Sequence, residues 1–168
     1  MRKLKGFTLI ELIVVITIIG ILMAFLIPNL INYVTSSKLT AANANANKVH
    51  MYALSYLTKA TIAGATVSPE IDGKVFTLKN PDGLVFDDSF TFGTEVTPEM
   101  FEDAVSYNLG AIGINTNYAV RLDDTGIPVA AWWARNRADW VVGEYPNARS
   151  MEEAEIGETL GQQIPDTW

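Results

Sequence analysis

Residues 7–27 form an almost unbroken apolar run, and this run constrains the fold more than any other feature of the chain. Its exceptions are Thr8, Glu11, Thr17 and Gly20. As an α-helix the run would be roughly 31 Å long, which is about the thickness of the hydrocarbon core of a bilayer. A buried helix in a soluble protein is a poor alternative, because the rest of the chain could not surround it. The run therefore predicts a membrane-spanning helix.

The charges around the run predict its orientation. Three cations precede it, Arg2, Lys3 and Lys5, and the next Lys or Arg is Lys38. By the positive-inside rule, the N-terminus is expected in the cytoplasm and the rest of the chain outside. Removal by ordinary signal peptidase is a weaker interpretation, because a secretory signal has a core of about 7–15 residues followed directly by a small-x-small site. The nearest such triplets lie at 42–46, well past the run.

Glu11 does not fit a plain membrane anchor. A charge near the bilayer centre costs roughly 2.5–3.5 kcal/mol on insertion scales, and the shallower Glu11 should cost less. An ionisable group inside a span indicates a functional role and needs a cationic partner. The alternative is a side chain that extends to the membrane interface.

The residues around Glu11 resemble a known processing motif. A short basic leader is followed by Gly6-Phe7-Thr8-Leu9-Ile10-Glu11 and then by the apolar run. In these features residues 1–55 resemble the type IV prepilins. The resemblance implies that a prepilin peptidase cleaves after Gly6 and methylates the new N-terminal residue, Phe7. It also implies that the Phe7 amine then lies near Glu11 of a neighbouring subunit, with Thr8 in the same assembly site.

The resemblance also implies partners and a location. The expected partners are other copies of the chain in a homopolymeric filament, the peptidase, a pilus assembly platform in the membrane, and inner-membrane lipid before assembly. The chain would be a single-pass membrane protein with an external head, and later part of a pilus at the cell surface. We expect no cofactor. The formal net charge of −7 argues against a general nucleic-acid binder, and no specific nucleic-acid site is visible.

The helical pattern continues beyond the apolar run. Pro28 predicts a kink, because proline cannot donate to the carbonyl of Ala24; alternatively it marks the exit from the membrane. A stripe of apolar residues then recurs at steps of three and four: Leu39, Ala42, Ala46, Val49, Ala53, Tyr56 and Ala60. Small residues on this stripe would let a sheet approach closely, and Gly64 predicts the helix end. We therefore expect a leader at 1–6, a transmembrane or filament-core helix at 7–27, an amphipathic outer half at 28–64 and a head at 65–168.

The head is expected to be an antiparallel sheet packed on the outer half of the helix, which makes the chain α+β with the pilin fold. Turn residues predict hairpins that join 75–79 to 84–88 and 118–122 to 127–131, and a further strand is expected at 140–144. Thr97-Pro98 predicts the start of a short helix with Met100, Phe101, Ala104 and Val105 facing inward, and Ser150 begins a capping box with Glu153.

Little in the head predicts chemistry. Asp87, Asp88, Asp123 and Asp124 are weak candidates for calcium ligands, against the simpler interpretation of solvated turns. Three tryptophans, Trp132, Trp133 and Trp140, could stack on sugars, but core packing on one face is the more common role. His50 lies just off the helix stripe and is expected in solvent or at an interface. One His and no Cys leave little for a hydrolase triad or a zinc site, so we expect no enzyme.

Three functions remain open at this stage. The first is a structural subunit of a type IV pilus. The second is a pseudopilin of a type II secretion or DNA-uptake system, and the third is a single-pass anchored binding domain that never polymerises. The absence of Cys means that the C-terminal disulfide of many Gram-negative pilins is missing. In this respect the chain is similar to Gram-positive type IV pilins and to pseudopilins.

Overall fold

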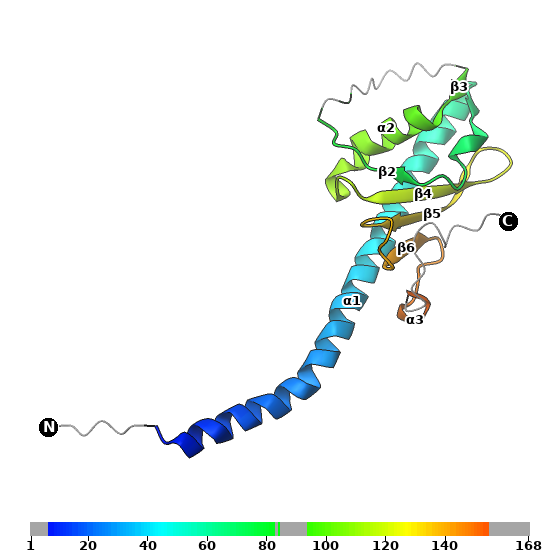
Figure 1. The fold of residues 1–168 in the computed structure, drawn as a ribbon. Helices are drawn as coiled ribbons and strands as arrows, with labels where there is room; N and C mark the ends of the chain where they lie inside the picture. The colour runs from blue at the N-terminus through cyan, green and yellow to red at the C-terminus, as the bar shows by residue number, and fades with distance from the viewer. Residues whose placement is uncertain (1–6, 83, 85–93, 155–168) are drawn as a thin grey trace. The chain divides into compact units, whose positions relative to one another are not determined.

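The structure is a computed structural model that describes residues 7–82, 84 and 94–154 (Figure 1). The chain divides into two compact units, Met1–Ser37 and Lys38–Trp168. The long helix α1 (Leu9–Ile62) contributes its first half to one unit and its second half to the other.

The first unit consists, in its described part, of the N-terminal half of α1. The helix continues through Pro28, which is the proline inside it. The side-chain Nδ2 of Asn29 donates a hydrogen bond to the backbone carbonyl of Phe25 at 3.0 Å, so a side chain supports the backbone in this turn. The predicted kink at Pro28 stays a prediction.

The second unit is built around a four-stranded antiparallel sheet in the order β2-β4-β5-β6. Its strands are β2 (Phe76–Thr77), β4 (Asn117–Leu122), β5 (Pro128–Ala134) and β6 (Val142–Tyr145). A separate parallel pair is formed by β1 (Thr66–Val67) and β3 (Glu95–Val96). The other elements in the described part of this unit are α2 (Pro98–Leu109), α3 (Met151–Ala154) and two 3₁₀ turns, Pro69–Ile71 and Gly110–Ile112.

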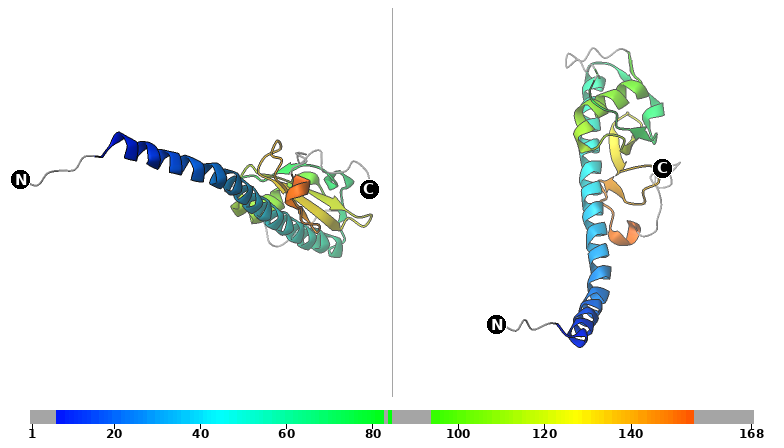
Figure 2. Two further views of the ribbon diagram at one scale, coloured as in Figure 1. Left: turned by 90° about the horizontal axis from the view of Figure 1, so that it is seen from below. Right: turned by 60° about the vertical axis from the view of Figure 1, so that its left-hand side comes forward.

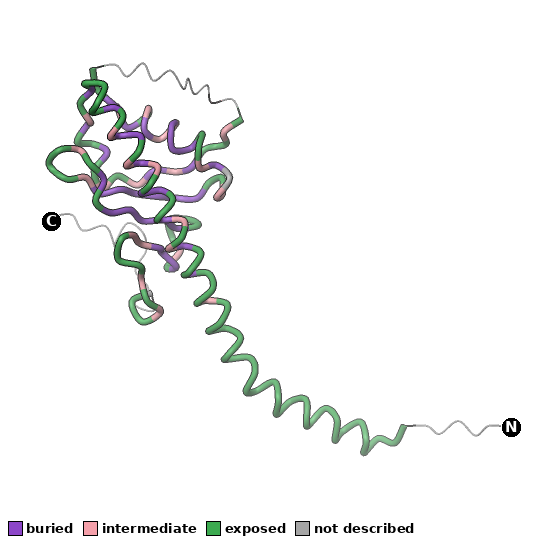
Figure 3. The backbone as a smooth tube through the Cα atoms, turned by 180° about the vertical axis from the view of Figure 1, so that it is seen from behind, coloured by how far each residue is buried: buried purple, intermediate pink, exposed green. Residues whose placement is uncertain are grey.

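The second half of α1 packs against the sheet through the predicted stripe. All seven stripe residues are buried, each with less than 5% of its surface exposed (Figure 3). Both views in Figure 2 show the sheet alongside this part of the helix. The helix ends two residues before Gly64, whose φ of +88° lies in the left-handed region that favours glycine. The expected α+β class, with a long N-terminal helix on an antiparallel sheet, is confirmed.

Among the described residues of the second unit, two buried clusters are found. The larger joins the α1 stripe to the sheet and to Phe101, Ala104 and Val105 of α2. The smaller is formed by Ala119, Ala130, Trp132, Ala134 and Val142. Thr97 accepts a hydrogen bond from the Met100 amide, so the predicted start of α2 is confirmed. Met100 itself is only partly buried.

The strand predictions are confirmed in part. The hairpin of β4 and β5 forms around the Asp123–Gly126 turn, and β6 lies within two residues of the expected strand. The predicted hairpin of 75–79 with 84–88 stays a prediction; among the described strands, β2 pairs with β4. Most of its second strand lies outside the described residues.

Candidate assembly site

The N-terminal half of α1 exposes an unusually large apolar surface. Every large apolar side chain from Phe7 to Val34 is at least 43% exposed. The helix is long enough and apolar enough to cross a membrane. Monomeric soluble proteins rarely expose contiguous apolar patches of more than a few hundred Å², so this surface requires lipid or protein around it.

This helix begins with a capping box formed by Thr8 and Glu11. The Glu11 Oε2 atom accepts hydrogen bonds from the Thr8 backbone N–H at 2.9 Å and from the Thr8 hydroxyl at 2.6 Å. In return, the Glu11 N–H donates to Thr8 Oγ1 at 3.3 Å. Because Thr8 directly precedes the first helical residue, the box satisfies backbone groups that the helix start leaves without partners. The same Thr-x-x-Glu spacing is visible in the sequence, from which Thr8 and Glu11 are expected to act in assembly alone.

In the part of the chain that the structure describes, Glu11 has no cationic partner for the predicted ion pair. None of the ion pairs there involves Glu11. Gly6, the expected cleavage point, lies outside the described residues, whereas Phe7 is 81% exposed beside the capping box. The structure thus brings Phe7, Thr8 and Glu11 together at one helix start, and the source of a cation stays a prediction.

The candidate calcium ligands are placed only in part. Asp123 Oδ1 accepts from the backbone N–H and hydroxyl of Thr125 and from the N–H of Ile127, at 2.6–2.9 Å. These hydrogen bonds lower the pKa of the exposed Asp123 carboxyl below its ordinary value. Asp87 and Asp88 lie outside the described residues. Among the described residues, no three His, Asp or Glu side chains are grouped to hold a metal.

The tryptophans divide between the core and the surface. Trp132 is 1% exposed and belongs to the smaller cluster, whereas Trp133 is 8% exposed and belongs to the larger one. The Trp133 indole N–H donates to Thr116 Oγ1 at 3.2 Å. Trp140 is 38% exposed. Successive residues of β5 therefore serve opposite faces of the sheet, and core packing accounts for two of the three tryptophans.

The expectation that His50 lies in solvent or at an interface is wrong, because this side chain is 8% exposed. Its Nε2 lies 3.1 Å from the Pro128 carbonyl oxygen, and its ring packs on Tyr145 with centroids 4.6 Å apart. A carbonyl can only accept, so Nε2 carries the proton. The buried Nδ1 has no hydrogen-bond partner among the described residues. Sequence position alone could not show this, because the burial comes from β5 and β6.

His50 should make the head less stable at pH values below about 6.5, which is the ordinary pKa of an imidazole. Burial lowers the pKa of His50, and the hydrogen bond to Pro128 opposes this less strongly. The unfolded chain therefore binds this proton at a higher pH than the folded chain, and stability decreases as pH falls from 7.5 to 5.5. Thermal unfolding followed by near-UV circular dichroism should show a smaller pH dependence in His50→Gln than in wild type. Equal pH dependence in the two proteins would contradict this assignment.

Comparison with known proteins agrees with this geometry. Residues 1–27 match the family model described as the prokaryotic N-terminal methylation motif. The type IV major fimbrial protein FimA of Dichelobacter nodosus is 32% identical over 134 residues, which cover 80% of this chain and 74% of that protein. This chain belongs to the type IV pilin family. No solved structure matched the pilin with significance.

Family membership explains the two contrasting units of this pilin. Pilins are structural subunits rather than enzymes, and they assemble into filaments through self-association. An exposed apolar helix suits both membrane anchoring and later packing in a pilus. The expectations of an α+β pilin and of a non-enzymatic role are therefore confirmed at the level of the family.

Proposed function

We propose that this pilin is a structural subunit of a type IV pilus, processed after Gly6 and assembled through the N-terminal half of α1. The observation that carries the proposal is the exposed apolar helix that begins with the Thr8–Glu11 box. The similar protein of D. nodosus is named a major fimbrial protein, and the similarity extends far beyond the 27-residue motif.

Each part of the chain has a role in this proposal. Residues 1–6 form the leader that prepilin peptidase removes, and residues 7–27 span the inner membrane before they enter the filament core. Residues 28–64 connect this core to the head at 65–168, with Pro28 as the site of a kink. The assembly platform extracts the subunit from lipid, and the Phe7 amine then pairs with Glu11 of a neighbour. Removal of the leader is compatible with the capping box, because the box uses only Thr8 and Glu11.

A pseudopilin of a type II secretion or DNA-uptake system is the second candidate. The N-terminal motif supports both candidates equally. The length of the similarity to a fimbrial protein favours the pilus, because 134 aligned residues must include much of the head.

Filaments at the cell surface distinguish the two candidates. We expect the fraction sheared from cells to contain long filaments by electron microscopy, with this chain as their main protein by mass spectrometry. Deletion of the gene should remove the filaments, and plasmid expression should restore them. Short assemblies that stay in the envelope would support the pseudopilin. A chain that is found solely as a membrane monomer would contradict both.

A further inference from the structure

In the part of the chain that the structure describes, the head sheet has two outer strands, whose outward edges could pair with a strand from another copy. In the order β2-β4-β5-β6, these outer strands are β2 and β6. Unpaired N–H and C=O groups on such edges template pairing with other chains. Such unwanted strand pairing is most frequent for a protein that is concentrated in a membrane or a filament, where identical edges meet often.

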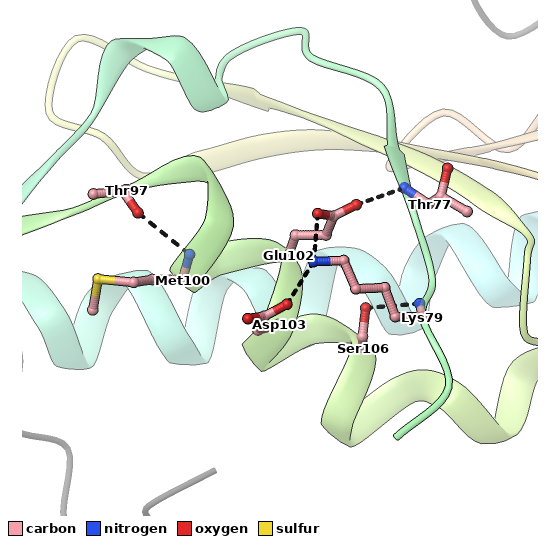
Figure 4. A network of polar contacts seen from close by, with 7 residues as sticks. All are labelled: Thr77, Lys79, Thr97, Met100, Glu102, Asp103 and Ser106. Atoms are coloured by element: carbon pink, nitrogen blue, oxygen red, sulfur yellow. Dashed lines mark hydrogen bonds and ion pairs between the residues drawn. The ribbon is translucent and has the colours of Figure 1, made fainter. Parts of the chain in front are cut away.

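Side chains of α2 cover the edge of β2 (Figure 4). The Thr77 N–H donates to Glu102 Oε1 at 3.3 Å, and the Lys79 N–H donates to Ser106 Oγ at 3.0 Å. Ser106 is fully buried. The Lys79 ammonium lies 2.9 Å from Glu102 Oε2 and 2.7 Å from Asp103 Oδ1, and it thereby holds the Glu102 carboxylate in place.

Asn43 of α1 covers the edge of β6. Its Oδ1 accepts from the Glu144 N–H at 3.0 Å and from the Arg149 N–H at 3.3 Å, while its Nδ2 donates to the Arg149 carbonyl at 3.0 Å. The amide side chain thus acts as a peptide group would in a neighbouring strand. Gly143 allows the close approach, because a Cβ there would collide with the backbone of Ala42 and Asn43.

We infer that Asn43, Glu102 and Ser106 close both edges of the head sheet against strand addition by a second copy. The N–H groups of Thr77 in β2, of Lys79 just after it and of Glu144 in β6 each donate to a helix side chain. The Val142 N–H of β6 donates to the Trp140 carbonyl of the chain itself. The apolar helix is then the polymerising surface, and the sheet is blocked from competing with it. This last consequence rests on the proposed function, whereas closure of the edges does not.

The test uses the full-length protein in detergent micelles, which cover the apolar helix and leave the head accessible. The variant is Asn43→Ala, and Asn47→Ala is the matched control because Asn47 is an exposed Asn on the same helix. Hydrogen exchange should show the Glu144 amide exchanging roughly fivefold faster in monomeric Asn43→Ala, since the hydrogen bond that protects this amide is lost. Light scattering and thioflavin T fluorescence should then reveal oligomers that grow from the folded protein.

Each outcome decides the inference. Oligomers in Asn43→Ala, with native near-UV circular dichroism and a monomeric Asn47→Ala, would support it. A folded Asn43→Ala protein with a fast Glu144 amide that stays monomeric would overturn it. If Asn43→Ala does not fold, Glu102→Ala opens the other edge at Thr77 of β2, and a folded, monomeric Glu102→Ala protein with a fast Thr77 amide would overturn the inference equally. Because no filament is measured, failure here leaves the proposed pilus function standing.

Discussion

Glu11→Ala should leave the pilin at normal levels in the membrane and almost abolish filaments. The substitution removes a charge whose insertion is unfavourable, so the anchor should insert at least as well as in wild type. It also removes the carboxylate that is proposed to pair with the Phe7 amine of a neighbour. Immunoblots of the membrane fraction and of the sheared surface fraction measure the two effects separately. Filaments at wild-type yield would contradict the ion pair.

The capping box requires a second variant, because Glu11→Ala also removes the acceptor for Thr8. Glu11→Gln is the matched control, since glutamine can replace glutamate in a capping box. The ion-pair account predicts that Glu11→Gln loses filaments nearly as completely as Glu11→Ala, although the helix start is preserved. Wild-type yield in Glu11→Gln would instead assign Glu11 to capping the helix.

Gly143→Ala should be the most damaging small substitution in the head. A Cβ at this position would collide with the main-chain carbonyl of Ala42 and the main-chain nitrogen of Asn43. Overpacking a well-packed core costs about 1–3 kcal/mol, and we expect roughly 3 kcal/mol or more because backbone atoms must move. The backbone movement that Gly143→Ala requires would also displace Asn43 from the edge of β6.

The control for this variant is Gly20→Ala, where an added Cβ has no atom within 4 Å. Thermal unfolding of the full-length variants in detergent, followed by near-UV circular dichroism, compares the two. We expect a markedly lower midpoint for Gly143→Ala and an unchanged midpoint for Gly20→Ala. Equal midpoints would show that β6 can move away from α1 without any decrease in the stability of the head, which would contradict this prediction.

Features that depend on neighbouring residues could be predicted from the sequence. All seven residues of the predicted α1 stripe are buried, because the 3.6-residue period determines which side chains share one face. Leu57 is equally buried on α1 but lies outside the predicted stripe. The Ser150–Glu153 capping box and the β4–β5 turn were predicted for the same reason, since the partners lie within four residues. The apolar run and Glu11 identified the candidate assembly site in the same way.

Features that depend on distant residues could not be predicted. Asn43 meets Arg149, which is 106 residues away, and His50 meets Pro128, which is 78 residues away. The periodicity of α1 places both side chains beside the stripe but does not show which strand covers them. The need for glycine at position 143 could not be predicted either, because it comes from the backbone of Ala42 and Asn43, which leaves no space for a Cβ.

The intact mass of the subunit in sheared filaments tests the central claim most directly. Cleavage after Gly6 removes six of the 168 residues, so the mature chain should contain 162 residues, begin at Phe7 and carry one additional methyl group. Fragmentation should place that methyl group on the Phe7 amine. Filaments built from a chain that retains Met1, or from one that starts near residue 45, would contradict the account.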